Sequence, residues 1–219
     1  MSVRELLRHN DERFCAHARV LSADDWTRPS LCDGSTNQEV LAHLVVGLSA
    51  APGSMAAALV HHRGIFDNAN AEMATAMAAR RSAADLLDDF ERLSRRPRGL
   101  GRYFPSRLFL GDHVTHELDI IFALGRNPDI AHDALIAVLN TQVSVPNPFV
   151  PAFRNARSLR LRTTDAAWRH GEHGPVVEGR AAELVSVLGS RPHMLERLRG
   201  EGVVVLESRL SRPTRTGGR

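Results

Sequence analysis

The sequence predicts a mainly α-helical protein, with an N-terminal antiparallel bundle of four helices over residues 1–145 and a small α+β domain over residues 152–210. Three observations lead to this prediction. Apolar residues recur at helical spacing through most of the bundle region. Pro146, Pro148 and Pro151 then interrupt regular structure, and the apolar pattern that follows has the period of two that is typical of strands.

The first two helices of the predicted bundle have recognisable beginnings. A helix over residues 2–21 places Leu6, Phe14 and other apolar residues on one face. The second helix begins near residue 37, because Thr36-Asn-Gln-Glu39 is a capping box in which the first and last residues bond reciprocally. Pro52-Gly53 is expected to kink or break this helix, which then continues or restarts toward His62.

Three more helices follow in the sequence. The alanine-rich residues 70–95 predict a third helix, with an internal restart at Ser82. A fourth is predicted over residues 106–124, ending at Gly125, and a fifth over residues 130–143.

The α+β domain is expected to contain a half-buried strand at residues 158–163, where apolar and polar residues alternate. Residues 167–170 and 176–178 are predicted to pair as a hairpin. Residues 180–189 are predicted to be helical, and the apolar run at residues 203–207 is interpreted as a strand.

Composition excludes several classes of protein and site. All 28 basic residues are arginine, and they alternate with acidic residues, so no phosphate-binding stripe and no nucleic-acid partner are expected. The N-terminus lacks the apolar core of a signal peptide and no apolar run is long enough to span a membrane, so we expect a cytoplasmic protein without a membrane partner. Cys15 and Cys32 are then free thiols, and residues 211–219 a disordered tail.

The residues that could form a functional site lie mainly on the fourth predicted helix. Asp112, His116 and Asp119 stand at i, i+4 and i+7 and therefore share one face. Burying such groups without partners costs several kcal/mol, which metal coordination can offset. His43 is the natural third ligand, because it lies on the apolar side of another bundle helix.

Two histidines and one carboxylate suit Zn²⁺, with nickel, iron or manganese as alternatives, and leave one coordination position open. The competing interpretation is an ordinary ion pair between Asp112 and His116, which is frequent at this spacing. Asp119 is better placed to accept a hydrogen bond from His116 than to bind metal. His113 and Glu117 are expected at the surface or edge, with His113 as a substitute ligand if the helix is rotated.

Cys32 can be a soft ligand, a reactive thiol or a small buried apolar residue. The histidine pairs His61-His62 and His170/His173 lie near predicted element ends, where solvated side chains are expected. The sequence has no glycine-rich phosphate loop, no Gly-x-Ser-x-Gly elbow, no Cys-x-x-Cys pair and no His-Glu-x-x-His motif, which argues against the corresponding reactions.

Two motifs carry a resemblance to a known family: Trp26…Pro29-Ser-Leu-Cys32-Asp-Gly34…Val40-Leu-Ala-His43, and Asp112…His116-Glu-Leu-Asp119. In order and spacing they resemble the mycothiol-dependent maleylpyruvate isomerase family, within the wider DinB-like metal-binding helix bundles. The resemblance implies a DinB-like bundle whose metal ligands are His43, Asp112 and His116. Two C-terminal stretches, Glu178 through Pro192 and Leu198 through Val203, resemble the small sterol-carrier-like domain of these proteins.

The sequence departs from the family pattern at two positions. Asp112 stands where the isomerases have Glu, and Ser35 stands where the family motif has Trp. The first shortens a ligand and the second alters a pocket wall or a core contact. Because of these two departures, the resemblance does not extend to the specific maleylpyruvate reaction. It still implies the same class of reaction.

The resemblance implies a metal-dependent, mycothiol-dependent transferase or isomerase that acts on a small electrophilic substrate, as a monomer or homodimer. Mycothiol or a similar low-molecular-weight thiol is then a cofactor beside the metal. Arg191, in Gly-Ser-Arg-Pro, is a candidate catalytic residue that can present a guanidinium to a carboxylate of the thiol or substrate; its alternative is an ordinary surface arginine. The competing functions are a non-catalytic metal or small-ligand binding protein and an apolar-ligand carrier that uses the C-terminal domain.

Overall fold

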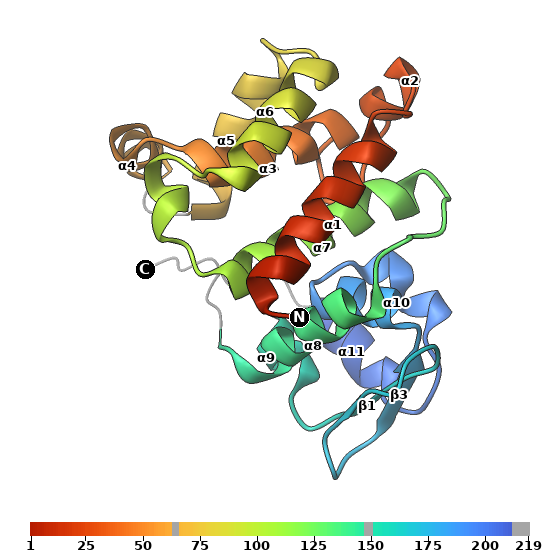
Figure 1. The fold of residues 1–219 in the computed structure, drawn as a ribbon. Coiled ribbons are helices and arrows are strands. Elements are labelled where there is room, and N and C mark those ends of the chain that lie inside the picture. Colours follow the sequence, from red (N-terminus) through yellow and green to blue (C-terminus); the bar gives the residue numbers. More distant parts are fainter. Residues whose placement is uncertain (63–65, 147–150, 212–219) are drawn as a thin grey trace. The chain divides into compact units, whose positions relative to one another are not determined.

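The computed structural model describes residues 1–62, 66–146 and 151–211, and this part of the chain is mainly helical with one small sheet (Figure 1). The predicted fold class is therefore confirmed. The chain divides into two compact units, Met1–Asp129 and Ile130–Arg219. Apart from Ser211, the predicted disordered tail lies outside the described residues.

The first unit is helical throughout its regular structure. Its helices are α1 (Val3–Ala18), α2 (Ala23–Thr27), α3 (Asn37–Ser49), α4 (Pro52–His61), α5 (Phe66–Ala78), α6 (Ala83–Arg95), the short 3₁₀ helix η1 (Gly99–Tyr103) and α7 (Ser106–Ala123). The helices α1 and α3 each pack against both α6 and α7, which closes a four-helix bundle. The helix α5 packs against α3 and α4 beside this bundle (Figure 1).

Hydrogen-bonding residues at the helix starts explain where several of these helices begin. Capping boxes form at Ser2, Ser22, Thr36 and Ser82, each with an acidic residue three positions later. Each box satisfies backbone N–H groups that the first turn of a helix leaves without partners. The capping box predicted at Thr36 is confirmed, and Pro52 begins α4 as expected for a residue that has no N–H to donate.

Two parts of the helix prediction need correction. The predicted helix over residues 70–95 is two helices, α5 and α6, because the capping box at Ser82 starts a new helix rather than continuing the old one. The helix α2 lies where the sequence predicts a loop, and it begins at the capping box of Ser22 and Asp25.

The bundle core is formed by large apolar side chains that are almost fully buried. Phe14 of α1, Leu41 of α3, Phe90 of α6 and Ile120 of α7 all belong to one cluster. Phe14 and Phe90 meet edge to face, with ring centroids 5.6 Å apart. Burial of each such side chain contributes roughly 1.5–3 kcal/mol, so this cluster is the main source of bundle stability.

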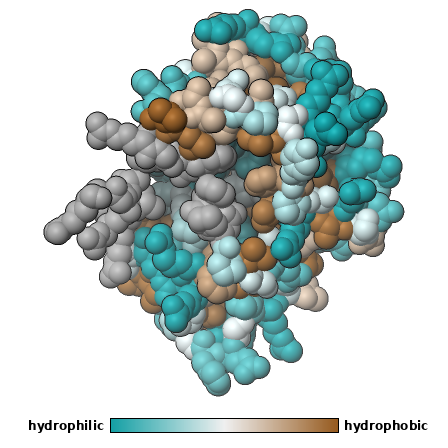
Figure 2. Space-filling model, turned by 90° about the vertical axis from the view of Figure 1, so that its left-hand side faces the viewer, coloured by the Kyte–Doolittle hydropathy of each residue, from teal (hydrophilic) through white to brown (hydrophobic). Residues whose placement is uncertain are grey.

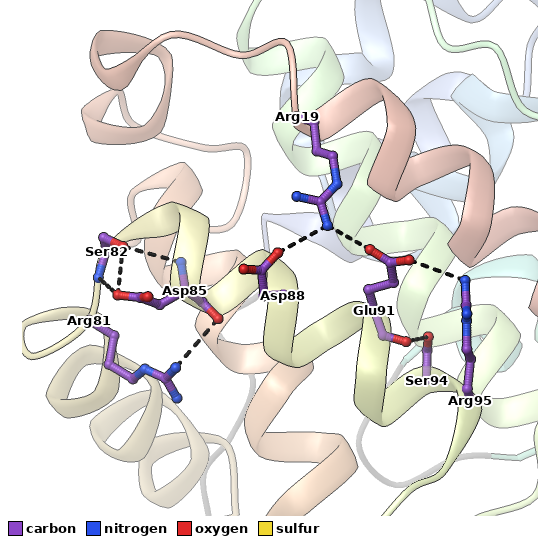
Figure 3. A network of polar contacts seen from close by, with 8 residues as sticks. All are labelled: Arg19, Arg81, Ser82, Asp85, Asp88, Glu91, Ser94 and Arg95. Atoms are coloured by element: carbon purple, nitrogen blue, oxygen red, sulfur yellow. Dashed lines mark hydrogen bonds and ion pairs between the residues drawn. The ribbon is translucent and has the colours of Figure 1, made fainter.

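A polar network links α1 to α6 at the bundle surface (Figure 3). The Arg19 guanidinium binds Asp88 at 3.0 Å and Glu91 at 2.6 Å, and Glu91 also binds Arg95 at 3.1 Å. Because these side chains are largely exposed, each pair contributes about 1 kcal/mol or less.

The second unit combines helices with a three-stranded sheet. Its elements are α8 (His132–Ser144), α9 (Ala152–Ala156), β1 (Arg160–Thr163), β2 (Arg169–His170), β3 (Val176–Gly179), α10 (Ala181–Leu188), the 3₁₀ helix η2 (Pro192–Arg197) and α11 (Val203–Leu210). The unit begins at Ile130, earlier than the predicted boundary between residues 145 and 152, because α8 packs against α9 and α10.

The strand pairing differs from the predicted hairpin. The central strand is β1, which pairs antiparallel with β2 and parallel with β3. Gly171 and Gly174 both have positive φ, and a Cβ on either would lie 2.2 Å from the backbone oxygen of Leu159 or Ser158. The segment between β2 and β3 therefore crosses the start of β1 and delivers β3 to the opposite edge of the sheet.

The strand predicted at residues 203–207 is wrong, because these residues begin α11. An antiparallel bridge joins Arg199 to Glu178 of β3, and Gly200, at φ +104°, turns the chain so that Gly202 N–H donates to the Val176 carbonyl before α11 begins. The following residues bury Leu206 and leave Val204 69% exposed, which is the one-sided burial of a surface helix.

Hydrophilic and hydrophobic side chains are interspersed on the face drawn in Figure 2. Among the described residues, no helix combines the length and the apolar character that crossing a membrane requires.

We predict that Ser82→Ala lowers the free energy of unfolding by about 1 kcal/mol, because it removes the hydroxyl that caps α6. The matched control is Ser94→Ala on the same helix, whose hydroxyl donates to the Glu91 carbonyl (Figure 3) and should change stability by about 0.5 kcal/mol or less. Urea unfolding of both variants measures the difference. Equal effects would mean that the cap does not stabilise the start of α6.

Candidate metal centre

The three predicted ligands come together between α3 and α7. The helix α3 carries His43, and α7 carries Asp112 and His116 one turn apart. The Asp112 Oδ1 atom lies 3.6 Å from Nε2 of His43 and 3.6 Å from Nε2 of His116. All three donor atoms lie within 4.8 Å of one another, so two imidazoles and one carboxylate converge on one point.

The remaining ring nitrogen of each histidine has its own polar partner. The Nδ1 atom of His116 lies 3.0 Å from Oδ2 of Asp119, which is fully buried on α7. The Nδ1 atom of His43 lies 2.9 Å from the side-chain amide of Asn70 on α5. These contacts fix the ring orientations and direct both Nε2 atoms toward Asp112, as outer partners of metal-binding histidines do.

The surroundings of the site favour an ionised Asp112 carboxylate beside a neutral His116 imidazole. Desolvation opposes ionisation of Asp112, but the polar contact with His43 at 3.6 Å and the charge of His116 outweigh it and hold the Asp112 pKa below its ordinary value. Burial, reinforced by the neighbouring His43, lowers the pKa of His116. A carboxylate and neutral imidazole nitrogens are the donors that zinc and other divalent metals use, so this donor set fits a cation.

Two other groups of potential ligands occur among the described residues. Cys32, in the loop before α3, lies with His116 and Asp119, and its backbone neighbour Leu31 donates to the Asp119 carbonyl. The other group, His61, His62 and Glu72, is more exposed, and His62 Nε2 is 2.7 Å from Glu72 Oε2. Sequence spacing does not indicate either group, because each joins residues from separate elements.

The opposite side of α7 corrects one expectation. His113 and Glu117, which the sequence places at the surface or edge, are 2% and 1% exposed. His113 Nδ1 lies 2.8 Å from Asp11 of α1, so its ring is engaged away from the candidate metal ligands. Glu117 accepts hydrogen bonds from Asn10, at 3.1 Å, and from Arg13.

Sequence reasoning did not identify Asn70 of α5, nor Asn10 and Asp11 of α1, as partners of these side chains. In the sequence, each of these residues resembles an ordinary polar residue on a helix surface. Only the packing of α5 and α1 against neighbouring helices shows that they are buried. Asp119 is the acceptor that the sequence predicts for His116, and it occupies that position.

Arg191 belongs to the second unit. It lies just before η2, and its Nη1 donates to the Gly189 carbonyl oxygen at 2.5 Å.

Residues 7–100 match the family model described as the mycothiol maleylpyruvate isomerase N-terminal domain. The matched stretch spans most of α1 and all of α2 to α6, so this part of the first unit is similar to that domain. The matched residues include His43 and end before Asp112 and His116.

The similarity to solved structures covers more of the chain. A mycothiol-dependent maleylpyruvate isomerase, and a variant of it with one histidine replaced by alanine, each match with a TM-score of 0.57 and 16% identity over 91% of both chains. At this identity the likeness to the isomerase is a likeness of fold. No curated protein matches the chain.

We predict that the free energy of unfolding of the Glu117→Gln variant, relative to that of the unmodified protein, increases as the pH rises from 5 to 8. Burial raises the pKa of Glu117 from 4.5 to about 7 against the opposing charge of Arg13. Between these values the folded state holds a proton that the unfolded state has lost, so the unfolding free energy falls as pH rises. At about 1.4 kcal/mol per pKa unit, the change is at most about 3 kcal/mol.

Urea unfolding at several pH values measures this difference. Glu172→Gln, in the exposed segment after β2, is the control for a loss of charge that involves no burial. A difference between the Glu117→Gln variant and the unmodified chain that stays constant from pH 5 to 8 would contradict a raised pKa at Glu117.

Proposed function

We propose that the protein is a metal-dependent enzyme that uses a low-molecular-weight thiol, as a transferase or isomerase of a small electrophilic substrate. The observation that carries this proposal is the convergence of His43, Asp112 and His116, with both imidazoles oriented by partners at Nδ1. A simple ion pair between Asp112 and His116 would not require a second imidazole at the same distance from the carboxylate.

His43, Asp112 and His116 would hold the cation, with zinc as the first candidate and nickel, iron or manganese as alternatives. When bound with three protein ligands, such a cation lowers the pKa of a thiol or water at the open position. Asp112 supplies the negative charge, Asp119 holds His116 by its Nδ1 atom, and the packing of α3 on α7 keeps the donor set together.

The identity of the thiol is proposed from the similarity of residues 7–100 to a family model whose description names mycothiol. We propose a cytoplasmic location on the same ground. Asp112 is shorter by one methylene than the glutamate expected from the family pattern, so we propose the reaction class without a particular substrate.

We predict that the chain binds one divalent cation tightly and that His43→Ala or Asp112→Ala weakens this binding by more than about 100-fold, beyond the 10–100-fold typical of an outer partner. Zinc titration of the cation-free protein by calorimetry measures the affinity. His62→Ala is the matched control, because it disrupts the exposed group with Glu72 and leaves the bundle site unchanged. Loss of the tight site in the His62→Ala variant instead would assign the binding to that exposed group.

We predict that mycothiol changes the visible absorption of the cobalt-loaded protein, because a thiolate entering the open position adds a sulfur ligand. The control is the same titration with a mycothiol analogue whose thiol is methylated. An unchanged spectrum at saturating thiol, with cobalt bound, would favour the non-catalytic metal or small-ligand binding protein.

We predict that Arg191→Ala raises KM for the thiol or for a carboxylate-bearing substrate by roughly tenfold, since a charge-assisted hydrogen bond contributes about 1.5–3 kcal/mol. Arg191→Lys keeps the charge and should recover part of the loss. If the Arg191→Ala variant loses stability and keeps its KM, Arg191 has a structural role within the second unit, where it donates to the Gly189 carbonyl, and no role in catalysis.

A further inference from the structure

Asn70 is the partner of His43 and is itself almost inaccessible to water. It lies on α5 with 6% of its surface exposed, and its side-chain amide is 2.9 Å from Nδ1 of His43. With the nitrogen Nδ2 facing His43, the Asn70 oxygen Oδ1 is buried and has no hydrogen-bond partner within residues 1–62, 66–146 and 151–211. A buried polar atom of this kind is costly, so its presence beside a metal-type donor set calls for a functional reason.

The amide can present either of its ends to His43. A half-turn about the last side-chain bond exchanges Nδ2 and Oδ1 with almost no change of shape. With Nδ2 facing the ring, Asn70 donates and His43 carries its proton on Nε2, where Asp112 Oδ1 lies 3.6 Å away. With Oδ1 facing the ring, Asn70 accepts from Nδ1–H, and the lone pair on Nε2 becomes available to a cation.

The other histidine of the site has no such choice. His116 Nδ1 faces the Asp119 carboxylate, and an ionised carboxylate only accepts hydrogen bonds. When Asp119 is ionised, it holds the proton of His116 on Nδ1 and leaves the Nε2 lone pair free. The two imidazoles of the site are therefore supported by chemically different partners.

We propose that Asn70 is a positioning residue that selects the tautomer of His43: it donates to Nδ1 in the cation-free protein and turns to accept from Nδ1–H when a cation binds. This inference rests on the proposed metal site. It predicts that cation binding moves the proton of His43 from Nε2 to Nδ1, while the proton of His116 stays on Nδ1.

Three variants separate the roles of the amide. Asn70→Leu has nearly the same size and removes both donor and acceptor, so we expect zinc affinity to fall about 10–100-fold. Asn70→Asp accepts only, so zinc affinity should stay within a few-fold of that of the unmodified protein. Asn68→Leu, at an exposed position of the same helix, makes the same chemical change away from the site and should leave affinity unchanged. Thermal unfolding confirms that each variant folds.

The second measurement is the tautomer of His43 in the folded protein, observed by ¹⁵N NMR of the ring nitrogens with and without zinc. We expect Nε2–H in the cation-free unmodified protein, Nδ1–H after zinc binds, and Nδ1–H in both states of the Asn70→Asp variant. Equal zinc affinity in the Asn70→Leu variant, or the same His43 tautomer with and without zinc, would overturn the inference.

The two readouts distinguish this inference from the proposed function. If the unmodified protein binds no zinc, the proposed metal site fails. If zinc binds at His43 and the Asn70→Asp variant keeps the proton on Nε2, the metal site stands and the role of Asn70 is wrong.

Discussion

Helix α7 places ionisable side chains on two sides of the bundle, and each of them needs a partner because an isolated charge in a protein interior costs several kcal/mol. Asp112, His116 and Asp119 face one way, while His113 and Glu117 face α1. The helices around α7 carry the complementary groups. The packing of α1 and α3 on α7 therefore also brings these side chains their partners.

The two sides of α7 satisfy their charges differently. Toward α1, Glu117 has donors of its own in Asn10 and Arg13, and His113 lies 2.8 Å from Asp11. On the other side, one carboxylate lies at 3.6 Å from two imidazoles, which is longer than a hydrogen bond. Direct contacts thus pair Glu117 and one nitrogen of His113, while the buried Nε2 of His113 has no hydrogen-bond partner among the described residues. In the second arrangement, the proposed cation would bind all three side chains.

Spacing along a single helix was the most reliable guide to the site. Residues at i, i+4 and i+7 share a face wherever the helix lies, so the sequence places Asp112, His116 and Asp119 together without any knowledge of packing. The same spacing does not say which face is buried. The expectation of His113 and Glu117 near the surface therefore fails, and only the position of α1 accounts for their burial.

The sequence by itself determined the helical bundle, the capping box at Thr36, the change to strand periodicity and the residues that share a face with His116, because these depend on neighbours within a few positions. Tertiary structure alone decided the order of the sheet, the helical state of Val203–Leu210 and the contact of Asn70 with His43. Each of these depends on contacts between segments far apart in the chain. The type of a residue does not indicate which distant residue it will contact.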